Sequence, residues 1–468
     1  MKCPICDSVT WKNLDKYRDA NYWWNIDRLE LDKPVGFMMC LKCGFLTYDQ
    51  YESEEKIKDF YRTKYRNAVM PMNHVTCNRK NRYHKAFLHD RLIQWAKEGK
   101  TFLDVGCAQG SMLKFLRDEY GWKNENLAGT EWTIGFRNFA TKEYGLNVTE
   151  DWDKSKKYDI ISMYRVLEHV WEPDKKLASL RDMLAPKGLL YISVPVWLGL
   201  LEDPPGAFTN DFENLFHLNH CQVFTEKTVE LLFAKVGLKA VWSDKTTYGY
   251  TVLLEKCDPA PAKEFDKDYP AQVEKDIERQ LKAVKFLAEG KPAEAVAVWP
   301  HFPDAWCAWA SHKENARDRD TIKTILENGL KATNNHVKVM MAMAMMYLQF
   351  GGGKRGDMTY SNDIKQAEKW LLKVLEQRGG EDVYHSLAVI EYVYKKNEDK
   401  AVEYWKEVLK LNPMRYGESW AFIGHARGGM ALPENRGEER PRIDPTPVTM
   451  VVQPKLKGLA QSMGAREA

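Results

Sequence analysis

The segment Leu103–Gly110 (LDVGCAQG) places an aspartate and two glycines between an apolar, strand-like run and an amphipathic, helix-like run. Glycine allows a tight turn and a close approach of the backbone to a ligand, and the first amides of the following helix point outward. The spacing of Gly106 and Gly110 fits neither a P-loop nor the dinucleotide pattern G-x-G-x-x-G. Asp104 would repel a phosphate but could hold an ammonium group. The loop therefore predicts a ligand with a cationic part at the carboxyl edge of a sheet.

Two further acidic residues follow strand-like runs and extend this predicted site. Glu131 ends the second run, where a carboxylate can accept two hydrogen bonds from a ribose diol, and Trp132 offers a ring face for adenine. Asp151 ends the third run beside Trp152 and could accept a hydrogen bond from the amino group of adenine. A ligand that combines ribose, adenine and a cationic amino-acid tail is S-adenosylmethionine.

Four of the nine cysteines form two C-x-x-C pairs near the N-terminus, Cys3–Cys6 and Cys40–Cys43. Two such pairs can supply four thiolates in a tetrahedron, and bound zinc contributes folding energy that so short a segment lacks. We expect a structural Zn²⁺ site in a small β-ribbon, with strands in VGFMMC and GFLTY. A redox role is disfavoured because neither pair opens a helix after a strand. The other cysteines are scattered and do not indicate a disulfide framework.

Strand-like runs after Thr101 would position the residues of the predicted ligand site. They are TFLDVG, NLAGTEW, LNVTED, YDIISMYR, GLLYISVPV, LKAVWSDKTTY and GYTVLLEKC. The first five are separated by helix-length segments, which predicts parallel strands. The last two meet at 248–250 without room for a helix, so they should pair antiparallel. The predicted fold class is α/β, with a Rossmann-like seven-stranded sheet.

The chain beyond Cys257 changes from an α/β pattern to a helical one. A proline-rich, charged stretch at 258–275 is expected to be a linker. Residues 276–432 follow helical patterns, and the segments AEKWLLKVL (367–375) and AVEYWKEVL (401–409) lie one tetratricopeptide period of about 34 residues apart. We therefore expect a C-terminal all-α domain of tetratricopeptide-like (TPR) repeats. The tail 433–468, rich in proline and charge, is expected to be mobile.

The motifs FLDVGCAQG, GTEW, TEDW, YDIISMYRVLEHV and LAPKGLLYISVP occur in this order, ahead of the antiparallel pair. In this combination the chain resembles the class I S-adenosylmethionine-dependent methyltransferases, above all a bacterial-type group with L-E-H-V after the fourth strand. The resemblance covers roughly residues 75–257. The expected domains are a zinc module at 1–50 and a methyltransferase domain at 51–257, with a helical lead-in at 51–100. Relatives that include sugar C-methyltransferases carry a similar four-cysteine zinc module.

The resemblance also implies a role for each residue of the predicted cofactor site. It puts Asp104, Gly106 and Gly110 on the methionine part of S-adenosylmethionine, Glu131 and Trp132 on the ribose, Asp151 and Trp152 on the adenine, and Tyr164 and Arg165 beside the sulfonium. The two tryptophans could instead cap the core of the domain.

Groups that could remove a proton from the methyl acceptor must come from the loops after the fourth and fifth strands. The candidate catalytic residues are Glu168, His169, His217 and His220. In the family that the chain resembles, the histidine of L-E-H-V lies near the mouth of the active site. His217 and His220 could instead form hydrogen bonds with backbone groups of a lid. They could also be two ligands of one metal ion, although the sequence shows no further ligand near them.

The sequence favours a small molecule or a glycan as the methyl acceptor, with the repeats binding a partner protein. The fourth strand leads into MYRVLE rather than the [ND]-P-P-[YFW] motif of base methylation, and no Pro-Cys nucleophile is present. A net charge of +3 gives little attraction to nucleic acid. The basic, aromatic stretch 61–85 is expected to be a solvated helical face, with RNA contact as the alternative. The alternatives are a scaffold that binds the cofactor without turnover, and a protein or RNA methyltransferase that uses the repeats for recognition.

Composition and the N-terminus bear on where the protein works. An apolar content of 44% and a charged content of 29% are ordinary for a globular chain. The N-terminus has no hydrophobic signal region, and no apolar run reaches the length of about 18 residues that spans a membrane. These features predict a cytoplasmic protein without a membrane partner.

Overall fold

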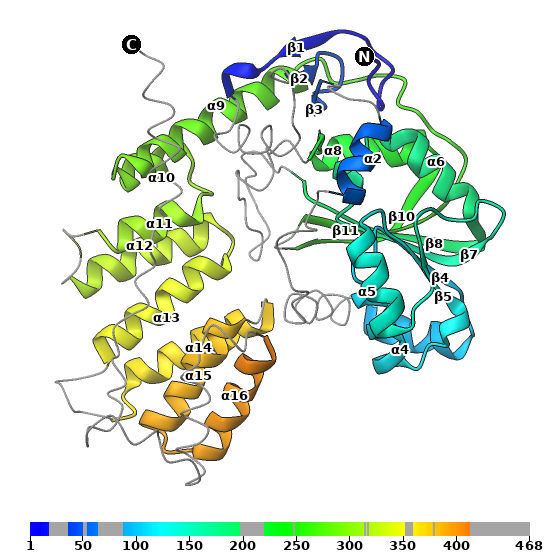
Figure 1. The fold of residues 1–468 in the computed structure, drawn as a ribbon. Helices are drawn as coiled ribbons and strands as arrows, with labels where there is room; N and C mark the ends of the chain where they lie inside the picture. The colour runs from blue at the N-terminus through cyan, green and yellow to red at the C-terminus, as the bar shows by residue number, and fades with distance from the viewer. Residues whose placement is uncertain are drawn as a thin grey trace. The chain divides into compact units, whose positions relative to one another are not determined.

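The computed structural model describes residues 1–17, 36–49, 54–63, 88–196, 220–246, 249–312, 315, 318–351, 359–377 and 380–411. The chain divides into two compact units (Figure 1). The first lies within Met1–Gly199 and Thr209–Leu281, and the second within Leu200–Phe208 and Lys282–Ala468. Among the residues described, no helix combines the length and the apolar character needed to cross a membrane.

A seven-stranded sheet organises the first unit, in the order β10-β11-β8-β7-β4-β5-β6. Its strands are β4 (Phe102–Val105), β5 (Leu127–Thr130), β6 (Val148–Thr149), β7 (Tyr158–Tyr164), β8 (Leu184–Val194), β10 (Leu238–Thr246) and β11 (Gly249–Lys256). The pairs among β4 to β8 are parallel, whereas β11 is antiparallel to both β8 and β10. The predicted α/β class is therefore confirmed, including the antiparallel closing pair.

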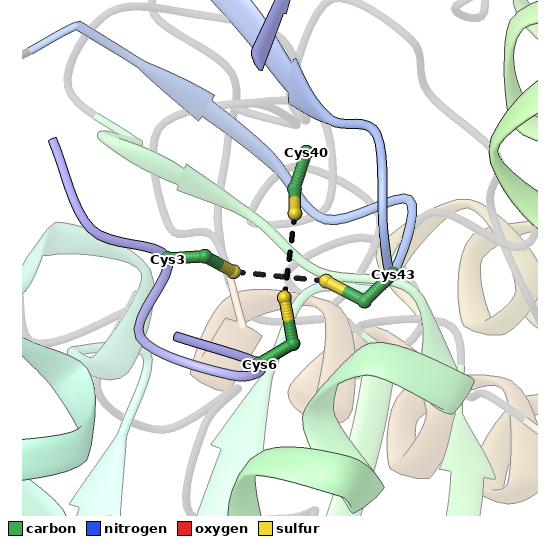
Figure 2. Close-up of side chains that lie close together, drawn as sticks. All are labelled: Cys3, Cys6, Cys40 and Cys43. Atoms are coloured by element: carbon green, nitrogen blue, oxygen red, sulfur yellow. Dashed lines mark hydrogen bonds between the residues drawn. The ribbon is translucent and has the colours of Figure 1, made fainter. Parts of the chain in front are cut away.

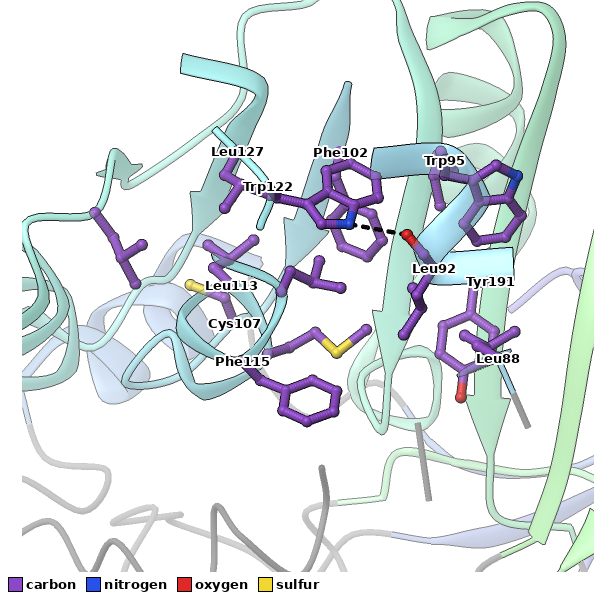
Figure 3. Packing of buried hydrophobic residues seen from close by; sticks show 14 of the residues in the cluster. Leu88, Leu92, Trp95, Phe102, Cys107, Leu113, Phe115, Trp122, Leu127 and Tyr191 are labelled. Carbon is purple, nitrogen blue, oxygen red and sulfur yellow. Dashed lines mark hydrogen bonds between the residues drawn. The ribbon is translucent and has the colours of Figure 1, made fainter. Parts of the chain in front are cut away.

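Helices flank this sheet, as a parallel sheet with two buried faces requires (Figure 1). They are α4 (Ser111–Tyr120), α5 (Ile134–Tyr144), α6 (Pro173–Met183) and α8 (Glu226–Lys235), together with the helical residues 88–97. Figure 3 shows one core, where the Trp122 ring meets Phe102 edge-on at 5.7 Å and its Nε1 donates to the Leu92 carbonyl at 3.3 Å. Full burial of a side chain such as Phe102 stabilises the fold by about 1.5–3 kcal/mol.

A second sheet, of order β1-β2-β3-β9, forms the N-terminal ribbon. Its strands are β1 (Trp11–Asn13), β2 (Phe37–Cys40), β3 (Leu46–Tyr48) and β9 (Gln222–Val223). The first three come from the segment expected to form the zinc module. The fourth comes from the chain between β8 and α8, and Leu46 pairs antiparallel with Val223. The ribbon is thus continuous with the residues that precede α8.

Helix α9 (Tyr269–Ala288) begins inside the stretch 258–275 that the sequence analysis expects to be a linker. Val273 and Ile277 of this helix belong to the same buried cluster as Phe37 and Tyr48 of the ribbon. The Tyr269 hydroxyl donates to Thr225 Oγ1 at 2.8 Å. The spacing of Tyr269, Val273 and Ile277 at every fourth residue gives one apolar helix face, and this face covers the ribbon.

All secondary structure described in the second unit is helical (Figure 1). The helices are α10 (Pro292–Val298), α11 (Pro303–Ala310), α12 (Arg319–Ala332), α13 (Val337–Gly351), α14 (Asn362–Gln377), α15 (Glu381–Val389) and α16 (Glu398–Leu411), with a π-helical turn at Ile390–Tyr394. Neighbouring helices pack against each other, including α13 on α14 and α15 on α16. The segments 367–375 and 401–409 lie in α14 and α16, one helix pair apart. Their assignment to TPR repeats stays a prediction, and the tail 433–468 lies outside the described residues.

Candidate functional site

The four N-terminal cysteines meet in the ribbon (Figure 2). Their Sγ atoms all lie within 4.8 Å of one another, with 3.6 Å between Cys3 and Cys43 and 3.4 Å between Cys6 and Cys40. A tetrahedral zinc ion with Zn–S bonds of about 2.3 Å holds its sulfurs roughly 3.8 Å apart. All four side chains are buried. The donor set and its spacing therefore fit a closed Zn²⁺ site.

Two matching turns bring these thiols together. The residue after each pair has a positive φ, 60° at Asp7 and 72° at Gly44. In each turn the amide of that residue donates to the carbonyl of the first cysteine, at 3.1 Å for Cys3 and 2.9 Å for Cys40. Lys235 Nζ of α8 donates to the Pro4 carbonyl at 2.6 Å and so ties the first turn to a helix that flanks the seven-stranded sheet.

The loop after β4 has the geometry expected of a ligand loop. Gly106 and Gly110 have φ values of 68° and 75°, in the left-handed region that favours glycine. A Cβ at Gly106 would lie 2.6 Å from a methyl group of Val166, and a Cβ at Gly110 would lie 2.7 Å from one of Leu146. Beneath the loop, the buried Asp104 carboxylate accepts a hydrogen bond from the Ser162 hydroxyl. These glycines are required by the packing as well as by the turn.

The Glu131 carboxylate is held by the loop itself. Its Oε2 accepts from the Ala108 amide at 2.9 Å, and its Oε1 accepts from the Thr133 amide at 2.8 Å, just before α5 begins. A carboxylate has about four acceptor positions, so Glu131 can accept further hydrogen bonds from a ligand.

Burial raises the pKa of the Cys107 thiol, and the nearby charges of Asp104 and Glu131 raise it further, so this thiol stays neutral.

The residues predicted to hold adenine also come together. Trp132 Nε1 lies 3.4 Å from Asp151 Oδ1, at the ends of neighbouring strands. Lys176 Nζ lies 4.1 Å from the centre of the Trp152 ring and 5.7 Å from that of Trp132. Glu131, Trp132, Asp151 and Trp152 are thus gathered at one edge of the sheet.

Helix α2 (Glu54–Thr63) contributes contacts that the sequence analysis did not assign. Lys58 Nζ lies 3.3 Å from Asp151 Oδ2, and Arg62 Nε donates to Glu150 Oε1 at 2.9 Å. The Tyr61 hydroxyl lies 3.3 Å from His169 Nδ1. Of the basic, aromatic stretch 61–85, the structure describes residues 61–63, and Tyr61 and Arg62 contact residues at the sheet edge. Residues 64–85 lie outside the described part of the chain, so the expectation for them stays a prediction.

The candidate proton acceptors form a second cluster beyond β7. Glu168 Oε1 lies 4.0 Å from His169 Nε2 and 3.9 Å from His220 Nε2. Glu168 and His169 lie in the short 3₁₀ helix Leu167–His169, and His220 precedes β9. Tyr164 and Arg165, at the end of β7, lead directly into this turn, and the Arg165 amide donates to the Ser193 carbonyl at 2.8 Å. His217 lies outside the described residues.

Comparison with known proteins bears on the sheet unit. Residues 78–243 match the family model of a methyltransferase domain. Solved structures similar to this chain include DesVI of Streptomyces venezuelae (16% identity, TM-score 0.30, 41% of this chain and 100% of that one). Another is a SAM-dependent methyltransferase from Aquifex aeolicus (20% identity, TM-score 0.28, 39% and 98%). A third is the sugar N-methyltransferase KedS8 from Streptoalloteichus sp. ATCC 53650 (14% identity, TM-score 0.27, 36% and 84%). No curated protein matches the chain.

The chain thus carries a methyltransferase domain, which confirms the enzyme class expected from the sequence. The domain match begins before β4 and ends within β10, so it covers the loop of Gly106, the carboxylate of Glu131 and the Glu168 turn. It does not extend to the four cysteines, to strands β1–β3 of the ribbon or to the helices of the second unit.

Proposed function

We propose that the protein transfers a methyl group from S-adenosylmethionine to a small-molecule or sugar acceptor. The observation that carries this proposal is the Glu131 carboxylate, which is oriented by amides from the glycine loop and from the start of α5. This arrangement lies within the matched methyltransferase domain, at the carboxyl edge of parallel strands where open α/β folds bind ligands.

Each part of the cofactor has a group to receive it. The free acceptor positions of Glu131 suit the two hydroxyls of a ribose, and Trp132, Asp151 and Trp152 lie beside it for the adenine. Gly106 and Gly110 have no side chains, so the loop backbone could approach the methionine part closely. Tyr164 and Arg165 lie at the end of β7, the strand next to β4, where the sulfonium would lie.

The acceptor side is the cluster of Glu168, His169 and His220. A carboxylate flanked by two imidazoles can orient an acceptor hydroxyl and take its proton as the methyl group is transferred. A small or sugar acceptor is favoured by the near-balanced charge of the chain and by the absence of sequence motifs for base methylation.

The four cysteines support a structural Zn²⁺ in this proposal. The cluster has four ligands and no open position, so the ion would stabilise the ribbon without taking part in methyl transfer. The helical second unit is proposed to bind a protein partner, because stacked helix pairs build extended concave surfaces that hold peptides.

An assay for S-adenosylhomocysteine release tests the proposed reaction. The full-length protein is mixed with S-adenosylmethionine and a panel of nucleotide-linked sugars, free glycans, RNA and peptides. We expect product with a sugar or small-molecule acceptor, a loss of about 10²-fold or more for Glu168→Gln, and normal rates for the exposed control Glu172→Gln. Release only with RNA or peptides, or no release from cofactor-bound protein, would instead favour the recognition and scaffold alternatives.

A further inference from the structure

Glu168 is an acidic residue that is both buried and incompletely paired. Its side chain is 1% exposed, and its Oε2 has no hydrogen-bond partner among the residues that the structure describes. Its Oε1 faces the Nε2 atoms of His169 and His220 at 4.0 and 3.9 Å, beyond hydrogen-bond distance. A buried carboxylate without sufficient partners is unfavourable unless a cation or a ligand completes its surroundings.

We propose that Glu168, His169 and His220 bind a divalent transition-metal ion, separate from the zinc site of the cysteines. Two imidazoles and one carboxylate are a donor set that suits zinc, iron and related ions. One ligand atom from each of the three residues lies within 4.8 Å of the other two. Ligand atoms of a tetrahedral site are about 3.4 Å apart, so the side chains would move inward by roughly half an ångström on binding.

The surroundings of the cluster have the features that hold metal ligands in place. The Tyr61 hydroxyl lies 3.3 Å from Nδ1 of His169, so this ring has a partner on the nitrogen opposite Nε2, the atom that faces Glu168. A partner on the second ring nitrogen is typical of metal-binding histidines. On the other side, the Thr47 hydroxyl donates at 2.8 Å to the carbonyl of Cys221, the residue after His220.

The backbone that carries the ligands is also fixed. Cys221 Sγ donates to the Glu168 carbonyl at 3.4 Å, and Gln222 Nε2 donates to the carbonyls of Val170 and Trp171 at 3.0 and 3.1 Å. These bonds join the 3₁₀ turn to the strand that enters the ribbon. The three ligands are therefore held together although the sequence places His220 far from the other two.

The proposed site has three protein ligands and so leaves at least one position open, as catalytic zinc sites do. An acceptor hydroxyl bound at the open position would have a lowered pKa and would release its proton to water, while the imidazoles hold the ion. Its oxygen would then form the bond to the methyl carbon as the carbon–sulfur bond of the sulfonium breaks. This role rests on the proposed function, whereas the binding of the ion does not.

Metal content provides the test. Full-length protein is saturated with Zn²⁺, passed through a desalting column and analysed for zinc per chain. We expect two ions for the parent protein, one for His220→Ala and one for Glu168→Gln. The exposed control His89→Ala should keep both. Thermal unfolding of each variant shows that it is folded.

Cobalt provides a second readout that does not depend on activity. Co²⁺ bound by thiolates has intense charge-transfer absorption, whereas a site of nitrogen and oxygen ligands shows only weak d–d bands. The weak bands should disappear in His220→Ala while the thiolate bands remain. One ion in the parent protein, or two in both variants, would overturn the proposal. If S-adenosylmethionine still binds in that case, the proposed methyltransferase function stands without the second metal.

Discussion

The first unit contains two clusters of metal-binding residue types, and they differ in how fully their atoms are used. In the cysteine cluster the four sulfurs face one another at distances near those of a zinc tetrahedron. In the Glu168 cluster three ligand atoms face one another at longer distances, and one buried carboxylate oxygen has no partner among the described residues. The first cluster is complete in itself, and the second is complete only with a ligand.

This difference separates a cluster that holds the fold from one that acts on a ligand. A closed four-thiolate site contributes to folding, because its ion is bound only when the ribbon is formed. A buried group with unused hydrogen-bonding capacity lowers stability and is kept where it is needed for binding or catalysis. Changes at the two clusters should therefore have opposite consequences for stability and for activity.

The largest effect on stability is expected for Cys40→Ser, which removes one thiolate from the closed cluster. Structural zinc in small domains supplies on the order of 10 kcal/mol, and much of it should be lost with the ion. Zinc content should fall by one ion per chain, and the midpoint of thermal unfolding should fall strongly. The matched control is Cys257→Ser, a free and partly exposed cysteine outside the cluster. Unchanged zinc content in Cys40→Ser would remove the distinction between the two clusters.

A smaller effect is expected for Thr47→Val, which removes one hydrogen bond between the ribbon and the segment of His220 and leaves the backbone pairing of β3 with β9 in place. The Thr47 hydroxyl donates to the Cys221 carbonyl, beside His220, and its loss should cost about 1 kcal/mol. The substitution should also loosen His220 and slow methyl transfer more than it lowers stability. Chemical denaturation and the methyl-transfer rate of the same preparation measure both effects. The exposed Thr10→Val in the same ribbon should change neither.

The smallest effect on stability is expected for Glu168→Gln. The amide keeps the shape of the side chain and removes a buried, incompletely paired carboxylate, so in protein without the second ion the free energy of unfolding should change by less than about 1 kcal/mol or increase. The methyl-transfer rate should fall in the same variant. A loss of stability as large as that of Cys40→Ser would mean that Glu168 holds the fold, and the contrast between the clusters would be wrong.

Features that depend on local pattern were predictable from the sequence. The strand-like runs from 101 onward form the seven strands of the sheet. The ends of these strands can be located from the runs, so the position of Glu131 and Asp151 at the sheet edge could be predicted. The turn within each cysteine pair could also be predicted, since the C-x-x-C spacing determines it.

Features that depend on pairing between distant segments were not predictable. Gln222 and Val223 are too few residues to be recognised as a strand, and they form one through pairing with Thr47 and Leu46. The meeting of His220 with Glu168 follows from that pairing, so the sequence could suggest both residues without showing that they touch. The contacts of Tyr61 likewise arise from tertiary packing. The apolar face at the start of α9, in contrast, could have been predicted from the spacing of its apolar residues.

The central claim is that the sheet edge at Glu131 binds S-adenosylmethionine. Calorimetric titration of the zinc-loaded, full-length protein with this cofactor tests it, alongside Glu131→Ala and the exposed control Glu125→Ala. We expect micromolar binding by the parent protein and by Glu125→Ala. For Glu131→Ala we expect affinity about 10- to 100-fold weaker, since hydrogen bonds to a charged group contribute about 1.5–3 kcal/mol. No binding by the folded parent protein, or equal affinity in Glu131→Ala, would contradict this assignment of the site.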